Sequence, residues 1–486
     1  MPEASGRAAA AAAAASGVAL WLASPAVGAG LLAWVAVVPA LAVRPRLAVP
    51  LAYGIFLELS LVPAFPFGLA EHQWGEPPVD VLVAESPVLL VALLGIPLVV
   101  VVLAAVRFPF PVVPDGVAGF VLVPALAWTA LDLVRAKLDP AGLWGPLFLS
   151  QHDTPAARLA ALGGPWLVTF ALVAVNAALA RAFAHGRLRP ARRADLAVPA
   201  LLAAGVVLAA ELAPVGSPGR RLVVAAVQPG YDTAEFERPV LRYFRRATRD
   251  YERGTLDLVR DLAPLTRAAG RAGADLIVWP EATAWVDPRA TPAVRGALGQ
   301  LAREVGATIV VPYFLRGPNA SGWVAVFADG RVTPARPKQR PMWFLGERSV
   351  RADVESAGRV GALLGVDGQE PRPARALARR GVRVLAASTH DWPQLARQQR
   401  ALARLHAIAL DVPLVRADWR YGSAVFDPPR VVADAGLERR RTLVLAAVEA
   451  RPARTPYAAL GDWPAAAALA AGGAALVLVR RRASAG

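Results

Sequence analysis

Three side chains in the middle of the chain have the types and the placement that acid–base chemistry needs. Glu281 directly follows LIVWP (residues 276–280), an apolar run suited to a buried strand. Because α/β proteins place chemistry at the carboxyl ends of strands, Glu281 is a candidate site residue. Lys338 is one of only two lysines in an arginine-rich chain, and Glu347 follows it nine residues later. An ammonium group is a compact charge whose pKa responds to its surroundings, which arginine cannot match, so Lys338 is also a candidate site residue. A solvated loop glutamate and a chance lysine would give the same local pattern.

Composition excludes several classes of protein and of site. The 486 residues are 56% hydrophobic, with a mean hydropathy of +0.42, which is too apolar for an ordinary soluble protein. The absence of cysteine excludes disulfides, thiolate metal sites and cysteine nucleophiles. The five histidines show no metal-ligand spacing, so we expect no metal or other cofactor. The net charge of +16 comes without a nucleic-acid-binding motif, and arginine-rich loops of a membrane protein explain it better.

Apolar runs of about the length that crosses a bilayer occupy both ends of the chain. We predict a membrane domain of about seven helices over residues 1–213, and a C-terminal membrane helix with a basic tail over 456–486. The runs lie at 8–24, 26–43, 48–66, 84–106, 117–136, 156–182, 195–213 and 457–479. With the N-terminus in the cytoplasm, most arginine-rich loops fall inside. Arg135 and Lys137 fall on the wrong side, and everything between about 219 and 450 would be extracytoplasmic.

The segment 219–450 lacks the long apolar runs found at both ends of the chain and has a different pattern. Short apolar runs alternate with helical stretches at 256–273 and 396–410, which predicts a layered α/β domain. The predicted strands are RLVVAAVQPGYD (221–232), DLIVWPE (275–281), ATIVVPYFL (307–315), WVAVFADGRV (323–332), RVGALLGVD (359–367), VRVLAAS (382–388) and PLVRAD (413–418).

Several of these stretches together resemble one known family. They are VQPG (227–230), DLIVWPEA (275–282), GRVTPARPKQRPMWFLGE (330–347), STHDWP (388–393) and TPYAALGDW (455–463), with GLWGP (142–146) and GPWLVTF (164–170) upstream. In order and spacing they resemble the apolipoprotein N-acyltransferase family of the nitrilase, or carbon–nitrogen hydrolase, superfamily. The resemblance implies a multi-pass protein of the bacterial inner membrane, with a helical membrane bundle and an extracytoplasmic α/β domain built as an α-β-β-α sandwich.

The resemblance also implies an activity and its residues. The family moves an acyl chain from a membrane phospholipid to the N-terminal amine of a diacylated lipoprotein. A cysteine thiolate first takes the acyl group as a thioester, which the amine then attacks. By resemblance, Glu281 is the general base, Lys338 stabilises the oxyanion and Glu347 is the auxiliary glutamate.

One departure from the family pattern decides the predicted function. The stretch that resembles the family's nucleophile segment is RVGALLGVD (359–367), where Gly365 stands at the position of the cysteine and Asp367 is the acid that follows. Glycine has no side chain and cannot form an acyl-enzyme. A hydroxyl nucleophile at Ser388 or Thr389, activated by Glu281 or His390, is an alternative that would need a rebuilt site.

We therefore predict a membrane-embedded relative of the acyltransferases that has lost covalent catalysis and still binds a phospholipid, a diacylated lipoprotein or a partner protein. An alternative is an active N-acyltransferase that transfers the acyl group directly with Glu281 and Lys338. A third possibility is a membrane carrier or structural subunit with only the fold in common, for which Glu58 and Glu85 are the candidate ionisable residues at membrane depth.

Overall fold

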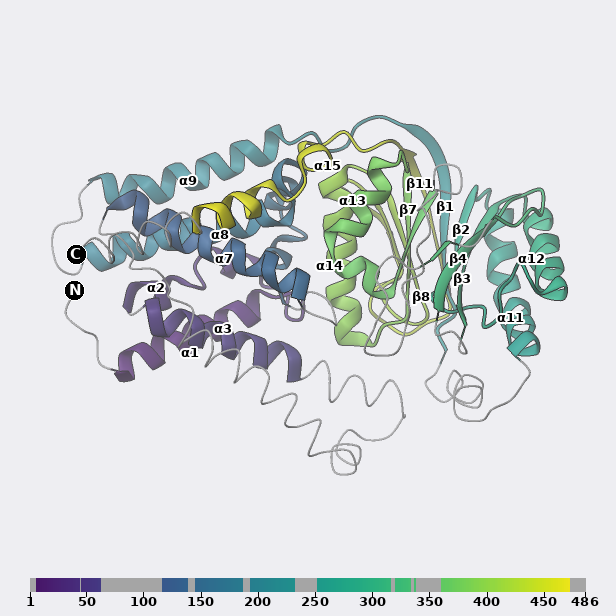
Figure 1. The fold of residues 1–486 in the computed structure, drawn as a ribbon, viewed down its shortest axis with the longest axis horizontal. Helices are drawn as coiled ribbons and strands as arrows, with labels where there is room; N and C mark the ends of the chain where they lie inside the picture. Colours follow the sequence, from purple (N-terminus) through teal and green to yellow (C-terminus); the bar gives the residue numbers. More distant parts are fainter. Residues whose placement is uncertain are drawn as a thin grey trace, which may run out of the picture.

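A helical part and an α/β part make up the computed structural model of the chain (Figure 1). The structure describes residues 6–43, 45–62, 116–138, 145–186, 193–231, 251–315, 320–333, 336–337 and 360–472. Together with a short segment near residue 460, the N-terminal residues up to about 212 form the helical part. The residues between them form two β-sheets with flanking helices.

Long apolar helices dominate the helical part. Within the described ranges, three helices are long and apolar enough to cross a membrane: Gly6–Ala23, Val117–Lys137 and Pro155–Phe183. The elements of this part are α1 (Gly6–Ala23), η1 (Gly30–Trp34), α2 (Val38–Val43), α3 (Pro45–Val62), α7 (Val117–Leu138), η3 (Leu147–Gln151), η4 (Pro155–Arg158), α8 (Leu159–Gly186) and α9 (Arg193–Leu212). The prediction of apolar helices suited to a membrane is confirmed for these segments, while the predicted total of eight spans stays a prediction.

The apolar run at 26–43 does not form the single helix that we expected. It forms the short 3-10 helix η1, a turn and the six-residue helix α2. At Gly30, where η1 begins, the backbone passes so close to η3 that a β-carbon would lie 2.1 Å from the carbonyl oxygen of Ser150. The predicted run at 84–106 lies outside the described residues. The run at 457–479 begins with the short helix α15 (Pro456–Leu460), which ends at Gly461 before helix resumes over 463–472.

Both cations on the wrong side of the predicted topology have acidic partners. Arg135 lies 3.6 Å from Asp132 on the same helix, α7. Lys137, also on α7, forms an ion pair of 2.7 Å with Glu370 of the α/β part. The C-terminal end of α7 therefore faces the α/β part. Asp132 of the same helix compensates the charge of Arg135, and Glu370 of the α/β part compensates that of Lys137.

Two sheets form the centre of the α/β part. One has six strands in the order β11-β1-β2-β3-β4-β5, and the other has five in the order β10-β9-β8-β7-β6. Strands β1, β2 and β3 run parallel in the first sheet, as do β6, β7 and β8 in the second. The strands are β1 (Arg220–Gln228), β2 (Leu276–Val278), β3 (Thr308–Leu315), β4 (Ala320–Val326), β5 (Arg336–Pro337), β6 (Val360–Leu364), β7 (Val384–Thr389), β8 (Leu414–Asp418), β9 (Ala424–Asp427), β10 (Arg430–Asp434) and β11 (Thr442–Ala450).

Helices cover the outer face of each sheet, so the predicted α-β-β-α sandwich is confirmed. Helices α11 (Tyr251–Arg271) and α12 (Pro292–Val305) pack on the six-stranded sheet. Helices α13 (Pro371–Arg379) and α14 (Pro393–Leu410) pack on the five-stranded sheet. A third apolar cluster fills the space between the sheets, from Val224 and Val278 on one side to Ala362 and Val415 on the other.

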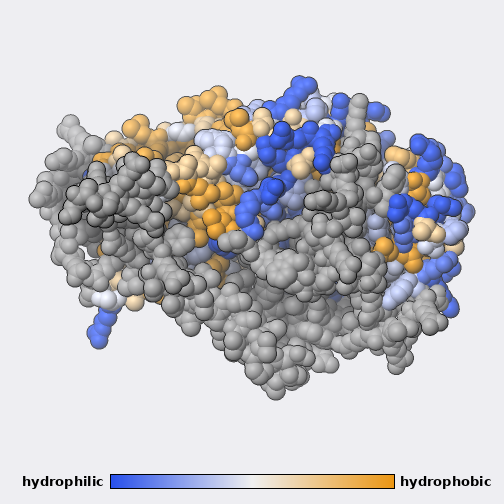
Figure 2. All heavy atoms as spheres, in the orientation of Figure 1, coloured by the Kyte–Doolittle hydropathy of each residue, from blue (hydrophilic) through white to orange (hydrophobic). Residues whose placement is uncertain are grey.

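The helical part and the α/β part share one hydrophobic core. A single cluster of buried residues runs from Trp166 and Leu172 of α8, through Leu402 and Leu405 of α14, to Leu414 of β8. In Figure 1, α13 and α14 accordingly lie between the helical part and the sheets, and α11 and α12 lie at the far end. Figure 2 shows hydrophobic residues gathered over the helical part and hydrophilic residues over the α/β part, as expected when only one part contacts lipid.

Candidate active site

Four strand ends meet where the two sheets face each other. The parallel strands β2, β6, β7 and β8 each carry a sequence-predicted or polar residue at or just beyond the carboxyl end: Glu281, Gly365, Thr389 with Asp391, and Asp418. Hydrogen bonds between the sheets hold these ends together, since Ser388 Oγ donates to the carbonyl of Trp279 at 2.8 Å. This is the edge at which α/β proteins place ligands and chemistry.

The turn that carries Glu281 is held on both sides. On one side, Thr283 Oγ1 and the backbone N–H of Ala284 both donate to the carbonyl of Pro312 in β3, at 3.0 and 3.1 Å. On the other, the carbonyl of Glu281 accepts a hydrogen bond of 2.6 Å from the indole N–H of Trp419. Between these anchors, Ala282 has a φ of +56°, which is rare and costly for a residue with a side chain.

Gly365 lies directly against the carboxylate of Glu281. Strand β6 ends at Leu364, and Gly365 begins the 3-10 helix η6 (Gly365–Gln369) with a φ of +47°. A β-carbon built on Gly365 would lie 2.6 Å from each carboxylate oxygen of Glu281. A side chain at position 365 would therefore point straight at the predicted base, and in this chain the carboxylate fills that space.

Asp367 turns back onto its own segment. It is buried, and its Oδ2 accepts a hydrogen bond of 3.3 Å from the backbone N–H of Leu364. The carboxylate thus supports the sharp turn from β6 into η6. Any catalytic role for Asp367 stays a prediction.

Lys338 and Glu347 lie outside the described residues. The last described residues before them, Arg336 and Pro337, form β5 and pair with Trp323 and Gly322 of β4. Of the five predicted site residues, the structure thus brings together Glu281, Gly365 and Asp367.

The two hydroxyls considered as alternative nucleophiles both donate hydrogen bonds within the protein. Ser388 is fully buried and donates to the Trp279 carbonyl. Thr389 Oγ1 donates to Asp418 Oδ2 at 2.7 Å. The neighbouring His390 is buried, which lowers its pKa to about 4 and keeps the imidazole neutral at pH 7.

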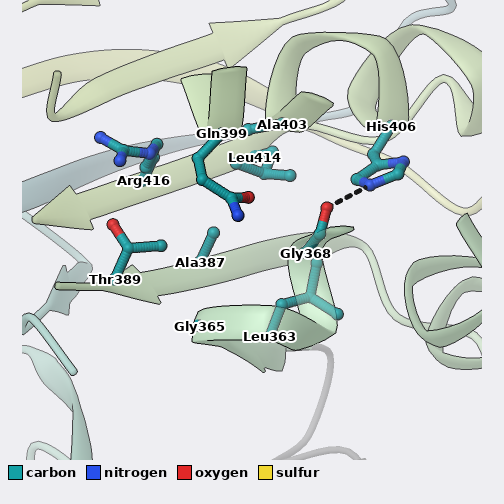
Figure 3. A pocket seen from close by; sticks show the side chains of 10 residues that line it. All are labelled: Leu363, Gly365, Gly368, Ala387, Thr389, Gln399, Ala403, His406, Leu414 and Arg416. Atoms are coloured by element: carbon teal, nitrogen blue, oxygen red, sulfur yellow. Dashed lines mark hydrogen bonds between the residues drawn. The ribbon is translucent and has the colours of Figure 1, made fainter. Parts of the chain in front are cut away.

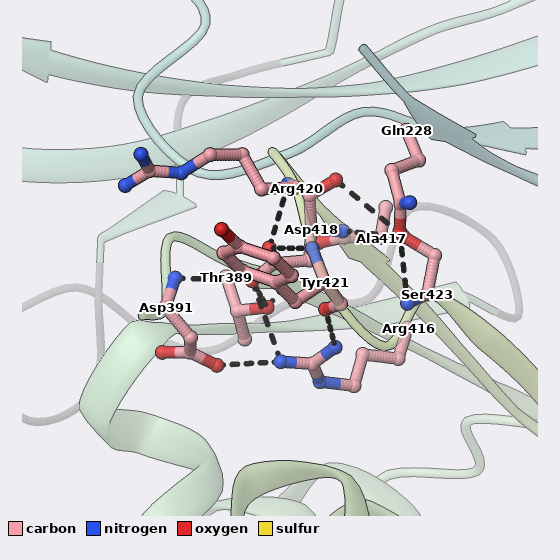
Figure 4. Close-up of polar contacts among 9 residues, drawn as sticks. All are labelled: Gln228, Thr389, Asp391, Arg416, Ala417, Asp418, Arg420, Tyr421 and Ser423. Atoms are coloured by element: carbon pink, nitrogen blue, oxygen red, sulfur yellow. Dashed lines mark hydrogen bonds and ion pairs between the residues drawn. The ribbon is translucent and has the colours of Figure 1, made fainter. Parts of the chain in front are cut away.

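A buried charge network lies beside the turn of Glu281 (Figure 4). The guanidinium of Arg416 is fully buried and lies 2.5 Å from Asp391 Oδ2 and 3.3 Å from Asp418 Oδ2. Burial is the main cause that raises the pKa of Asp391, to about 8, and the negative charges of Asp418 and Glu281 add to this effect against Arg416. Burial also raises the pKa of Asp418. One guanidinium does not offset two buried carboxylates, so we expect Asp391 to hold a proton at neutral pH.

A small cavity lies behind the turn at Gly365 (Figure 3). Its lining includes Gln399 and His406 from α14, Thr389 from β7 and Arg416 from β8. His406 forms a hydrogen bond of 2.7 Å with the carbonyl of Gly368. The cavity has room for about one water molecule, far too little for a fatty acyl chain.

Sequence reasoning missed two features of the site. One is the buried charge network around Arg416, and the other is the hydrogen bond from Trp419 to the carbonyl of Glu281. Asp391 lies in the family-like stretch STHDWP and Asp418 at the end of the predicted strand PLVRAD, yet their pairing with Arg416 was not predicted. The available signal was the pattern LVRAD at 414–418, in which two charged residues interrupt an apolar strand. A charge in a buried strand needs a buried partner.

Two family models match the chain over most of its length. The model of the apolipoprotein N-acyltransferase N-terminal domain matches residues 16–178, and the carbon-nitrogen hydrolase model matches residues 224–456. The chain belongs to the apolipoprotein N-acyltransferase family. The resemblance drawn from the motifs, and membership of the nitrilase superfamily, are thereby confirmed.

Curated relatives support the same family over a shorter span. The apolipoprotein N-acyltransferase of Pseudomonas aeruginosa is 32% identical over 238 residues, which are 46% of this chain and 42% of that protein. The enzyme of the same name from Pseudomonas syringae pv. tomato is 32% identical over 223 residues, which are 44% of this chain and 40% of that protein. The alignments thus span less than half the length of these relatives.

Solved structures with similarity to the chain include two enzymes of the nitrilase type. An amidase from Nesterenkonia sp. is 18% identical, with a TM-score of 0.36, and the match covers 49% of this chain and 94% of the amidase. A carbon-nitrogen hydrolase from Helicobacter pylori G27 is 14% identical, with a TM-score of 0.36, and the match covers 47% of this chain and 89% of that one.

Proposed function

We propose that this chain is an inner-membrane relative of the N-acyltransferases that binds a phospholipid or a diacylated lipoprotein without forming an acyl-enzyme. One observation carries the proposal. At the strand end where the family pattern has its nucleophile, this chain has Gly365, and the carboxylate oxygens of Glu281 lie 2.6 Å from the position that the first side-chain carbon would take.

The family chemistry requires an atom that can hold the acyl group. In the first step a nucleophile attacks the ester carbonyl carbon of a phospholipid, the ester C–O bond breaks, and the glycerol oxygen leaves with a proton as lysophospholipid. In the second step the lipoprotein amine attacks the carbonyl carbon of the acyl-enzyme, the bond between the acyl group and the nucleophile breaks, and the proton of the amine passes through a base to the released nucleophile. The sequence contains no cysteine, and the hydroxyls of Ser388 and Thr389 are buried donors to Trp279 and Asp418. Glu281 is then a base without a nucleophile to deprotonate.

Features that support retained binding lie outside the reacting centre. The helical part has long apolar helices, and α9 exposes large apolar side chains: Leu201, Val207, Leu208 and Leu212. The shared core between α8, α14 and β8 keeps the α/β part against the helices. The compensated charges of Arg135 and Lys137 agree with an extracytoplasmic position for the α/β part.

A reconstitution assay tests the proposal. The purified protein in phospholipid nanodiscs is given a diacylated lipopeptide, and the lipopeptide is analysed by mass spectrometry. We expect no triacylated product, while a fluorescent lipopeptide binds to protein-containing nanodiscs more tightly than to empty ones. The apolipoprotein N-acyltransferase of Pseudomonas aeruginosa is the positive control. Product above the empty-nanodisc background would overturn the proposal, and its loss in a Glu281→Gln variant would show that Glu281 takes part in the transfer.

A further inference from the structure

Trp419 lies outside the predicted site and contacts the turn of Glu281. It belongs to DWRYGS (418–423) and follows β8 directly. Its side chain is 1% exposed, and its indole N–H donates to the carbonyl of Glu281 at 2.6 Å. That bond joins the five-stranded sheet to the end of β2 in the six-stranded sheet.

The indole itself is fixed by its neighbours. The ring of Tyr231 stacks on it, with 5.5 Å between centroids and an interplanar angle of 26°. The His390 ring meets it edge-on at 6.3 Å. The backbone carbonyl of Trp419 accepts a hydrogen bond of 2.8 Å from Gly230, which follows β1. A donor held in this way cannot follow the Glu281 carbonyl if that carbonyl turns away.

The peptide that receives this hydrogen bond is the one next to the strained residue. Ala282 keeps a φ of +56° only while the peptide between Glu281 and Ala282 keeps its orientation. Rotation of that peptide would relieve the strain, and any part of it that the ψ of Glu281 does not absorb would shift the Glu281 side chain relative to Gly365. A strained backbone persists only where its surroundings hold it.

We propose that Trp419 is a positioning residue that holds the Glu281 carboxylate over position 365. The proposal rests on the assignment of these residues to the candidate active site. It does not depend on whether the protein turns over a substrate. It can therefore fail while the proposed function stands, and it can stand while the proposed function fails.

A thiol introduced at position 365 reports the position of the carboxylate. In a Gly365→Cys variant, the pH midpoint for alkylation by iodoacetamide measures the thiol pKa, which a nearby carboxylate raises. Exchange of Glu281 for Gln in that variant should lower the midpoint by about 1–3 pH units. Exchange of Trp419 for Phe, which removes the N–H donor, should lower it by at least about half a unit with Glu281 still present.

Matched controls separate positioning from general damage. Trp166 in α8 is also 1% exposed and donates a hydrogen bond of 2.7 Å, to Asp462, so Trp166→Phe in the Gly365→Cys variant should leave the midpoint unchanged. Loosening of the fold would speed alkylation at every pH without moving the midpoint. If Trp419→Phe does not fold, 3-benzothienylalanine at position 419 keeps the ring shape and removes only the donor.

Two results would overturn the proposal. The first is a midpoint that moves with Glu281→Gln but not with the loss of the Trp419 donor, which would mean that other contacts hold the carboxylate. The second is a midpoint that moves with neither change, which would mean that the carboxylate does not lie over position 365.

Discussion

A single methyl group added at position 365 should lower the free energy of unfolding markedly, and the contacts of Gly365 give the reason. In a Gly365→Ala variant, the new β-carbon would lie 2.6 Å from both carboxylate oxygens of Glu281, whereas ordinary van der Waals contact begins at 3.4 Å. The carboxylate must move by roughly 0.8 Å or more to make room. The backbone adds its own penalty, because a φ of +47° suits glycine and not alanine.

The magnitude follows from these two causes. A side chain in the left-handed region costs about 1–2 kcal/mol, and overpacking of a buried site costs about 1–3 kcal/mol. Gly365→Ala should therefore lower the free energy of unfolding by about 2–5 kcal/mol. Gly306→Ala is the matched control, since Gly306 has a φ of +66° with nothing within 4 Å of a built β-carbon. It should show only the backbone cost.

Urea unfolding in detergent, followed by tryptophan fluorescence, measures both variants. Truncation of the partner completes the test: in a Glu281→Ala background, the cost of Gly365→Ala should fall by about 1–3 kcal/mol, the share assigned to overpacking. Equal costs for the Gly365 and Gly306 variants would refute the contact between position 365 and Glu281. So would a cost that does not change when Glu281 is truncated.

Three further predictions concern buried and interfacial charges. The folded pKa of Asp391, about 8, lies above that of an unfolded aspartate, so its contribution to stability is complete at low pH and is lost as the pH rises through about 8. Asp391→Asn should remove this decline in the free energy of unfolding, whose slope is at most about 1.4 kcal/mol per pH unit. A variant that keeps the wild-type slope between pH 5 and 8 would contradict the raised pKa of Asp391. Arg416→Met leaves the buried carboxylate of Asp418 without its ion-pair partner and Asp391 without a hydrogen-bond donor, and should lower the free energy of unfolding at pH 7 by about 3–5 kcal/mol, whereas a neutral effect in urea unfolding would argue against the network. Lys137→Met should cost no more than about 1 kcal/mol, because Lys137 is partly exposed, and exchange of the charges between Lys137 and Glu370 should restore most of the loss in thermal unfolding. If a Glu370 variant alone unfolds at the same temperature as the wild type, the ion pair contributes nothing to stability.

Sequence patterns predicted the strands that carry the site because each strand is an apolar run with a clear end. Pro280 closes the run before Glu281, and Gly365 follows the run that became β6. Both strands are parallel members of their sheets, so each residue was predicted at the carboxyl end of its strand. The strands lie in different sheets, and the approach of Glu281 to Gly365 followed from the resemblance to the family and not from the strand pattern.

Contacts between distant elements were not foreseeable from local patterns. The bond from Trp419 to Glu281 depends on how the two sheets stack, and no periodicity encodes that. The ion pair between Lys137 and Glu370 depends on how α7 meets the α/β part. The close approach of Ser150 to Gly30, at the start of η1, joins segments more than a hundred residues apart.

The most direct test of the central claim is a search for an acyl group on the protein itself. The purified chain is incubated in phospholipid nanodiscs without a lipopeptide acceptor, and its intact mass is measured after acid quenching. The active relative from Pseudomonas aeruginosa, treated identically, controls for survival of a thioester. We predict an unchanged mass for this chain, because position 365 carries only a hydrogen atom. A mass increase equal to one fatty acyl group, mapped to any residue, would contradict the account.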